Sequence, residues 1–428
     1  MIHNQNRKEG PGFELPGVIG FLPVNKFSLA NSIDVSFIEA GSQDVTKIDW
    51  VFPAGAVQAD KPLLASTVGN LLVEGTKTKT ANEIADFLDF YGAYFSSSSY
   101  YHNSVVSLFC LTKDLPQLLP LMEDIIKNPS FLSSEIENYL NKRREEYLID
   151  SEKVRTLAAR KFHETVFGST HPYGRLAQLE DFSNLDRNDL EQFHRDYYLS
   201  GEAKIIVAGQ PGKEIYKLLD HHFGRNERFI ARTENTLDFS LAPSHEKFHF
   251  VEKRGAVQSA LRIGRPIFNN THPDFIPLMV VNTILGGYFG SRLMTSVREE
   301  KGLTYGIGSS LISYKESGLW MIVSEVAGEM RDQAVEAIFE EMMRLTKEPV
   351  SEDELDLVRN FMLGEMLRYF DGPFSTSDIY RTLQENQLDF DFYAKMEKEI
   401  RNITSHQIIA LARKYLQSEE FYVVVAGK

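Results

Sequence analysis

The 428-residue sequence predicts an α+β fold that consists of two homologous halves. First, a segment near the middle of the chain resembles the segment at its end. Second, strand-like and helix-like patterns are mixed in each half without strict alternation, which favours α+β over a doubly wound sheet. Third, 43% of the residues are hydrophobic and 25% are charged, as in ordinary globular proteins, and the length suits two to four domains.

The internal similarity is clearest between residues 185–210 and 403–428. Both segments have the pattern of a helix, a short turn and a buried strand that ends in Val-Ala-Gly. The last glycine of this motif is Gly209 in the first copy and Gly427 in the second, 218 positions later. This spacing is about half the length of the chain, as expected for a tandem repeat.

Two further pairs of segments agree with this repeat. The pattern at Ser134–Glu137 is typical of a capping box that opens a helix, and Ser351–Glu354 has the same pattern 217 positions later. The strand-like residues 50–53 correspond to residues 263–266 at a spacing of 213. The small drift predicts that a few residues have been inserted between equivalent positions.

The repeat divides the chain into an N-terminal half at residues 1–224, a linker at residues 225–247 and a C-terminal half at residues 248–428. The linker is polar and aperiodic, although it is long enough to include a short strand. In each half we expect a strand pair, a helix, another strand pair, two or three helices and a final strand.

Periodicity predicts individual elements in the first half. Ile33, Val35 and Phe37 alternate with polar residues, as in a half-buried strand. Apolar residues at helical spacing predict a helix from Leu115 that ends before Asn128-Pro129. Cys110, the only cysteine, follows an apolar run and is expected in a buried strand. A single cysteine excludes both an intrachain disulfide and a cysteine zinc cluster.

The net charge of −14 argues against nucleic acid or an anionic membrane surface as the main partner. No apolar run reaches the roughly 18 residues that a membrane span requires. The basic residues near the N-terminus are not followed by an apolar segment, so we expect no signal peptide. These features predict a cytoplasmic protein, or a periplasmic one if a leader has been removed.

Residues 60–76 resemble the active-site helix of the pitrilysin-like (M16) zinc peptidases, and a further helix is expected from Ala81. In catalytic members this first helix carries H-x-x-E-H. Its two histidines bind Zn²⁺ from one helix face, and its glutamate takes a proton from the zinc-bound water. The resemblance implies two halves of the LuxS/MPP-like metallohydrolase type, each a mixed, mainly antiparallel sheet covered by helices.

The resemblance places Ser66, Gly69 and Asn70 at the three key positions of that motif. Serine and asparagine cannot replace two imidazole ligands, and glycine has no base. None of the eleven histidines forms H-x-x-E-H; His245 and His249 are four residues apart, but they lie where a linker and a strand are expected. We therefore expect no bound metal and no catalytic residue in this chain. Glu145 and Glu146 lie near the family's spacing for a third ligand, but without the histidines they are expected to be solvated.

The second half contains two adjacent motifs. The glycine-rich stretch Gly286–Leu293 matches neither the P-loop nor the dinucleotide fingerprint. The next stretch predicts a helix that ends at Lys301, with Gly302 as its C-terminal cap and a strand from about Thr304.

This second stretch resembles the Arg-(x)6-Tyr pair of the C-terminal half of M16 peptidases, with Arg298 and Tyr305 in the two positions. In the family the pair hydrogen-bonds the substrate backbone and helps to stabilise the oxyanion. A guanidinium has a permanent charge and several donors, and donors aimed at developing negative charge accelerate catalysis. From spacing alone, an alternative is that Arg298 pairs with a neighbouring glutamate on the surface while Tyr305 belongs to the core.

The resemblance implies a catalytically incomplete subunit of a heterodimeric M16 zinc peptidase. A partner with H-x-x-E-H would supply Zn²⁺, while this chain would supply Arg298, Tyr305 and half of a chamber for extended or unfolded peptides. The chain would not be active alone. The alternative is a structural or peptide-binding homodimeric scaffold without peptidase activity.

Overall fold

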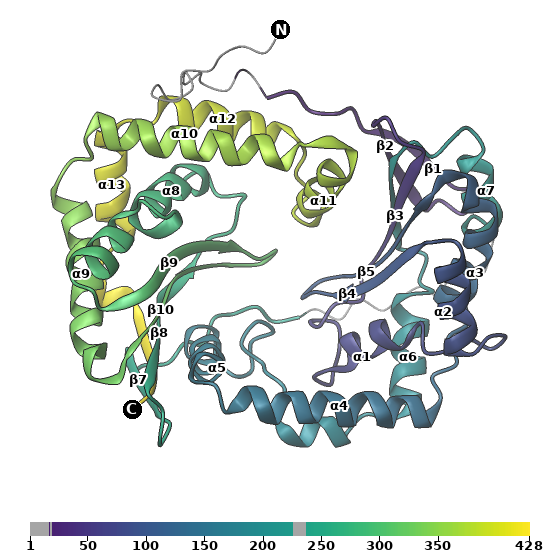
Figure 1. Ribbon diagram of the computed structural model, residues 1–428, viewed down its shortest axis with the longest axis horizontal. Coiled ribbons are helices and arrows are strands. Elements are labelled where there is room, and N and C mark those ends of the chain that lie inside the picture. Colours follow the sequence, from purple (N-terminus) through teal and green to yellow (C-terminus); the bar gives the residue numbers. More distant parts are fainter. Residues whose placement is uncertain (1–16, 18, 226–236) are drawn as a thin grey trace, which may run out of the picture.

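The computed structural model describes residues 17, 19–225 and 237–428, which form two mixed sheets covered by helices (Figure 1). In each sheet one strand pair is parallel and the others are antiparallel. The predicted α+β class is therefore confirmed. The first sheet has the order β1-β2-β6-β3-β5-β4 and the second the order β7-β11-β8-β10-β9. The strands are β1 (Asn25–Ser28), β2 (Asp34–Glu39), β3 (Val45–Phe52), β4 (Tyr94–Ser99), β5 (Ser104–Leu111), β6 (Lys204–Gly209), β7 (Phe248–Glu252), β8 (Gln258–Ile267), β9 (Thr304–Ser313), β10 (Gly318–Ala327) and β11 (Tyr422–Gly427).

The two sheets share a strand order and a register once β1 is set aside. Trp50 of β3 lies opposite Ile205 of β6, and Ile263 of β8 lies opposite Val423 of β11. These two pairs are related by the spacings of 213 and 218 that the sequence comparison gives. Equivalent residues therefore occupy equivalent positions in the two sheets.

Thirteen α-helices surround the sheets in the part of the chain that the structure describes. They are α1 (Leu64–Leu71), α2 (Ala81–Phe90), α3 (Leu115–Lys127), α4 (Ser133–Ser151), α5 (Val154–Phe167), α6 (Arg187–Tyr197), α7 (Ile215–Phe223), α8 (Phe275–Asn282), α9 (Arg331–Lys347), α10 (Glu352–Tyr369), α11 (Gly372–Glu385), α12 (Asp391–Asn402) and α13 (Ser405–Tyr415). Two short π-helical segments, η3 (Thr283–Gly287) and η4 (Met294–Glu300), precede β9. The sequence predicts one helix between the strand pairs and two or three before the final strand, which is too few. The first half has two helices between its strand pairs and four between β5 and β6.

The helix boundaries test the predicted caps. Helix α3 ends at Lys127, as its pattern predicts. Ser351 caps α10 by accepting a hydrogen bond from the Glu354 N–H at 3.2 Å. The capping box predicted at Ser134 is wrong: the N-cap of α4 is Leu132, two residues earlier, and its side chain cannot accept a hydrogen bond.

Each sheet packs one face against helices of its own half. Val35 and Phe37 of β2 point into the first hydrophobic core, which confirms the alternation in this strand. Cys110 of β5 is 2% exposed, as expected for a buried strand residue, and burial raises the pKa of its thiol to about 12. A second core of similar size lies in the other half.

The opposite face of each sheet is covered by a helix from the other half. Helix α11 lies on the first sheet, where Tyr380 packs against Ile206 and Ala208 (Figure 1). Helix α5 lies on the second sheet, where Ala158 packs against Ala260 and Ala426. The two halves are therefore joined through two equivalent helix–sheet contacts.

Polar contacts reinforce the position of α11 on the first sheet. The Tyr380 hydroxyl lies 3.1 Å from the Ser36 hydroxyl. The Lys47 ammonium donates to Asp378 at 2.7 Å. At the far end of the helix, Asn103 donates to Glu385 at 2.7 Å. These bonds fix the lateral position of α11, which apolar packing alone leaves free.

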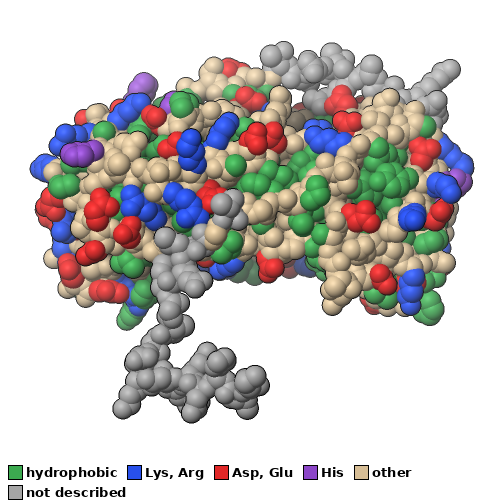
Figure 2. Space-filling model, turned by 90° about the horizontal axis from the view of Figure 1, so that it is seen from above, with side chains coloured by type: hydrophobic (Ala, Val, Ile, Leu, Met, Phe, Trp, Pro, Cys, Tyr) green, Lys and Arg blue, Asp and Glu red, His purple; other side chains and the backbone are tan. Residues whose placement is uncertain are grey.

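The expected linker at 225–247 is only partly described, since residues 226–236 lie outside the described residues. Residues 237–247 form neither a helix nor a strand, and β7 begins at Phe248. The boundaries of the two halves stay a prediction. None of the described helices is both long and apolar enough to cross a membrane. Figure 2 shows basic and acidic side chains interspersed over the upper face of the molecule, without a field of one sign.

Candidate functional site

Helix α1 is the segment where the sequence places the degenerate zinc motif. Leu64, Val68 and Leu71 are buried and hold the helix against the first core. The polar side chains on its other face bond to the helix backbone. The Ser66 hydroxyl donates to the Leu63 carbonyl oxygen at 2.9 Å, and the Asn70 amide donates to the Ser66 carbonyl oxygen at 2.7 Å.

Gly69 lets α1 approach strand β4 closely. A Cβ atom at this position would lie 3.0 Å from the hydroxyl oxygens of both Ser97 and Ser99 and 3.5 Å from that of Tyr198. The Ser99 hydroxyl also donates to the Ala65 carbonyl oxygen at 3.1 Å, which ties the strand to the helix. A side chain at position 69 would therefore crowd the serine hydroxyls of β4.

The residues present do not fit a zinc ion. Ser66 and Asn70 use their side chains within the helix, and Glu146 on α4 forms an ion pair with Arg143. His249 lies in strand β7, where its Nε2 atom is 3.0 Å from the Ser244 hydroxyl. Across the described residues, no three His, Cys, Asp or Glu side chains are grouped so that they could hold a metal ion.

Arg298 and Tyr305 lie on either side of a tight turn in the second half. Segment η4 ends at Glu300, one residue before the predicted end. Gly302 has a φ of +62°, and β9 begins at Thr304, as the sequence predicts. The Leu303 N–H donates to the Val297 carbonyl oxygen at 3.0 Å and closes the turn. The π-helical form of η4 was not expected, and it is a form that is frequent at functional sites.

Both side chains line an open depression of about 690 Å³. The Arg298 guanidinium lies over the Phe289 ring, 4.8 Å from its centroid. Its Nη1 atom forms an ion pair with Glu299 at 3.7 Å, so the alternative that Arg298 pairs with a neighbouring glutamate is confirmed, although this distance is too long for a hydrogen bond. Tyr305 is 94% exposed, so the alternative that it belongs to the core is wrong. The depression therefore presents a charged donor and a phenol to solvent.

The sequence analysis did not identify the residues that shape the depression at Arg298 or the contact of Gly69 with β4. Phe289 orients Arg298, and Val257, which is 84% exposed, extends the apolar part of the depression. Phe289 stands inside the glycine-rich stretch Gly286–Leu293 and is 67% exposed. The serines of β4 form a run in the sequence, and small side chains opposite a helix glycine indicate close packing.

Comparisons with known proteins agree along the chain. Residues 40–177 match the family model described as insulinase (peptidase family M16), and residues 184–362 match the peptidase M16 inactive domain. The uncharacterized zinc protease YmxG of Bacillus subtilis is 26% identical over 304 residues, which cover 70% of this chain and 72% of YmxG. An uncharacterized zinc protease of Mycobacterium tuberculosis is 23% identical over 368 residues, 84% of this chain and 82% of that protein. The probable inactive metalloprotease YmfF of Bacillus subtilis is 24% identical over 243 residues, 55% of each chain.

Two solved structures show the same fold. One is a peptidase M16 inactive domain from Pseudomonas fluorescens, with a TM-score of 0.83 and 23% identity over 95% of this chain and 98% of that one. The other is a protease from Helicobacter pylori, with a TM-score of 0.83 and 15% identity over 96% of this chain and 100% of that one.

Proposed function

The chain belongs to the M16 peptidase family, and from this premise we propose that it is a catalytically incomplete subunit of a heterodimeric M16 zinc peptidase. A partner chain with an intact H-x-x-E-H motif supplies the zinc ion, its ligands and the general base. This chain supplies Arg298, Tyr305 and half of the peptide chamber. The contrast between a filled zinc-motif helix and an exposed Arg/Tyr pair carries the proposal.

The state of the two side chains supports a role in substrate binding. The Arg298 guanidinium is held over an aromatic ring, and its ion pair with Glu299 at 3.7 Å leaves its N–H groups able to donate to a peptide. The exposed Tyr305 hydroxyl can donate one directional hydrogen bond. Together they can bind the carbonyl oxygens of an extended peptide and the oxyanion that forms when water attacks.

The first test is reconstitution. The isolated chain should contain no stoichiometric zinc and should cleave no peptide. Mixed with an H-x-x-E-H homologue from the same source, it should form a 1:1 complex by size-exclusion chromatography with light scattering. That complex should cleave a quenched fluorescent peptide. Zinc and peptidase activity in the isolated chain would contradict the proposal.

The second test separates binding roles from assembly. In the complex, Arg298→Ala and Tyr305→Phe should each lower kcat/KM, by up to about 10²–10³-fold for loss of an oxyanion donor. The 1:1 assembly should be unchanged. Matched controls are Arg187→Ala and Tyr216→Phe, which alter exposed residues on α6 and α7. If both site variants keep full activity, Arg298 and Tyr305 do not bind substrate and have only a structural role.

The alternative is a homodimeric structural or peptide-binding scaffold. The likeness to YmfF, whose name describes a probable inactive metalloprotease, favours this alternative. A stable homodimer that binds extended peptides, together with the failure of every H-x-x-E-H homologue from the same source to associate with it, would decide for the scaffold.

A further inference from the structure

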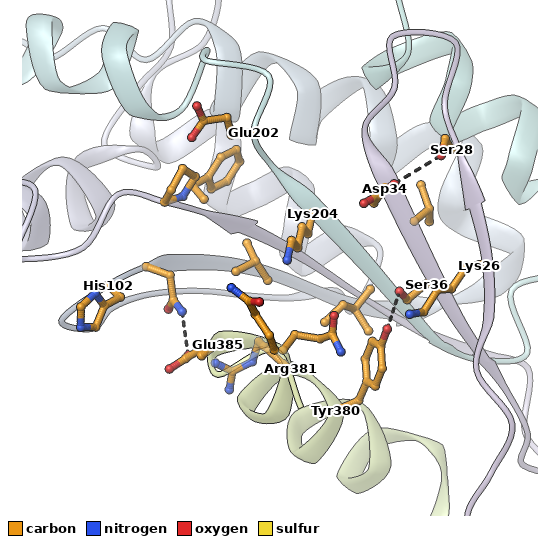
Figure 3. Close-up of a pocket in the computed structure, with 18 of the residues that line it drawn as sticks. Lys26, Ser28, Asp34, Ser36, His102, Glu202, Lys204, Tyr380, Arg381 and Glu385 are labelled. Carbon is orange, nitrogen blue, oxygen red and sulfur yellow. Dashed lines mark hydrogen bonds between the residues drawn. The ribbon is translucent and has the colours of Figure 1, made fainter. Parts of the chain in front are cut away.

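A second cavity lies at the contact between the two halves, away from Arg298 and Tyr305. It has a volume of about 420 Å³ and is enclosed by the inner face of the first sheet and by helix α11 (Figure 3). Strands β1, β2 and β6 form one wall, and Tyr380, Arg381 and Glu385 lie on the helix opposite. This volume falls in the range of small-molecule sites.

Two of the four cations that line this cavity lack strong partners. The Lys204 ammonium makes no hydrogen bond or ion pair with any residue that the structure describes, and in Figure 3 its side chain points toward α11. The Arg381 side chain is only 15% exposed, yet within the described part of the chain its one ion pair is with Asp378 at 3.7 Å, and Asp378 already accepts from Lys47 at 2.7 Å. The Arg381 guanidinium also lies 5.5 Å from the centroid of the Tyr100 ring. The Nε atom of Arg381 is buried without a partner. A guanidinium in this state favours an added anion.

The carboxylates that line the same cavity are already engaged. Asp34 accepts from the Ser28 hydroxyl at 3.3 Å, and Glu385 accepts from the Asn103 amide at 2.7 Å. Glu202 also has an interaction partner. His102 adds no charge at neutral pH, since burial and then the nearby Lys315 ammonium lower its pKa to about 4. Bonds from neutral donors do not cancel the charge of a carboxylate, but four basic side chains line the cavity against three carboxylates, so its net charge is positive. The basic residues are Lys26, Lys204, Lys315 and Arg381.

Part of the remaining surface of the cavity is apolar, beside the polar side chains of Ser36, Gln384 and Gln387. Val51, Phe52 and Ile206 line it from β3 and β6. Asn103 is 6% exposed and donates to Glu385, but its carbonyl oxygen is buried without a partner. That oxygen can accept one N–H, such as the last amide of a peptide.

We propose that this cavity binds a carboxylate joined to an aliphatic group, as at the C-terminus of a peptide that ends in leucine. Lys204 and Arg381 bind the carboxylate, the apolar residues contact the aliphatic group, and Asn103 accepts the amide N–H. A free aliphatic acid offers the first two features without the third. The site does not involve Arg298, Tyr305 or a zinc-bearing partner, so it stands independently of the proposed function.

Isothermal titration calorimetry on the full isolated chain tests the site with three probes. They are an acetylated Gly-Ser peptide that ends in leucine with a free carboxylate, the same peptide as its C-terminal amide, and 4-methylpentanoate. We expect the free-acid peptide to bind at least about tenfold more tightly than the amide, because the amide lacks the charge-assisted bonds. If 4-methylpentanoate binds as tightly as the peptide, the natural ligand is a small acid; if it binds more weakly, a peptide C-terminus is favoured. Both of these results support the site.

Two variants locate the binding. Lys204→Gln and Arg381→Gln should each weaken binding of the free-acid peptide by at least about tenfold. Lys217→Gln, an equal charge change on the outer helix α7, should leave it unchanged. Lys204 is exposed, so its variant tests the site even if Arg381→Gln loosens α11. Equal binding of acid and amide, absence of binding, or unchanged affinity in Lys204→Gln would overturn the proposal.

Discussion

Gly69 is the position where helix α1 lies against the serines of β4. A Cβ atom at this position would lie 3.0 Å from the hydroxyl oxygens of Ser97 and Ser99, which is closer than ordinary van der Waals contact. A larger side chain at position 69 therefore requires these neighbours to shift.

We expect Gly69→Glu to lower the free energy of unfolding by about 1–3 kcal/mol, because the new side chain overpacks the contact with Ser97 and Ser99. Chemical denaturation measures this loss. The matched control is Gly364→Glu in α10, where an added Cβ meets no atom within 4 Å and no loss is expected.

The same close packing predicts the outcome of a full reversion. A variant that combines Ser66→His, Gly69→Glu and Asn70→His should still hold less than one zinc per chain by inductively coupled plasma mass spectrometry. Stoichiometric zinc in a folded triple variant would show that the β4 serines do not close the site.

His194 gives stability a dependence on pH. Burial lowers the pKa of this imidazole to about 4, although its Nε2 atom bonds the Ile126 carbonyl oxygen at 2.7 Å. The unfolded chain protonates near pH 6.5, so this contribution is complete above pH 6.5 and is lost as the pH falls toward 4. Burial also lowers the pKa of the His102 imidazole.

We expect the wild-type protein to lose about 2 kcal/mol more stability than His194→Gln between pH 7 and pH 5. Urea denaturation at the two pH values measures the difference. His221→Gln, at an exposed position of α7, should behave like the wild type. A parallel loss in wild type and His194→Gln would contradict the assignment.

At the scale of elements, helices α5 and α11 depend on small or well-matched contacts with the opposite sheet. Ala158 of α5 is fully buried against Ala260 and Ala426, so no room exists for a larger side chain. Ala158→Leu should therefore lower the free energy of unfolding by about 1–3 kcal/mol. The neighbouring Ala159→Leu, at a half-buried position, should cost less, and equal urea midpoints for the two variants would argue against tight packing of α5.

Local patterns predicted the elements better than their partners. The spacing of apolar residues was sufficient for α3, and alternation was sufficient for β2, because each pattern repeats within a few residues. By contrast, nothing local in the sequence indicates that Tyr380 packs on Ile206 of the other half. Helix α4 shows a further limit, since a serine and a glutamate at capping distance did not form the cap.

The candidate sites show the same limit: residues close together in the chain could be predicted as a group, and residues far apart could not. Arg298 and Tyr305 are seven residues apart, and the sequence predicted the turn that separates them. Lys204 and Arg381 are far apart in the chain, and only the packing of α11 on the first sheet brings them to one cavity. The absence of zinc ligands could be read from residue types, whereas the closure of the space around Gly69 required the position of β4.

At the scale of the whole molecule, each half completes the other. Without α11, the first sheet would expose Ile38, Ile206 and Ala208 to water. Without α5, the second sheet would expose Ala260 and Ala426. Burial of these surfaces couples the stabilities of the two halves.

We therefore expect differential scanning calorimetry of the full chain to show one transition with a calorimetric to van't Hoff enthalpy ratio near one. Residues 1–224 and 248–428 expressed separately should bind a dye for exposed apolar surface, and mixing them should reduce that signal. Two resolved transitions in the full chain would show that the helices contribute little to the coupling.

The reciprocal placement of α5 and α11 also restricts the motion of the two halves relative to each other. Separation of the halves would remove both helices from their sheets at once and would expose two apolar surfaces to water. The two halves should therefore move together as one rigid unit, since any opening between them costs the burial of both contacts.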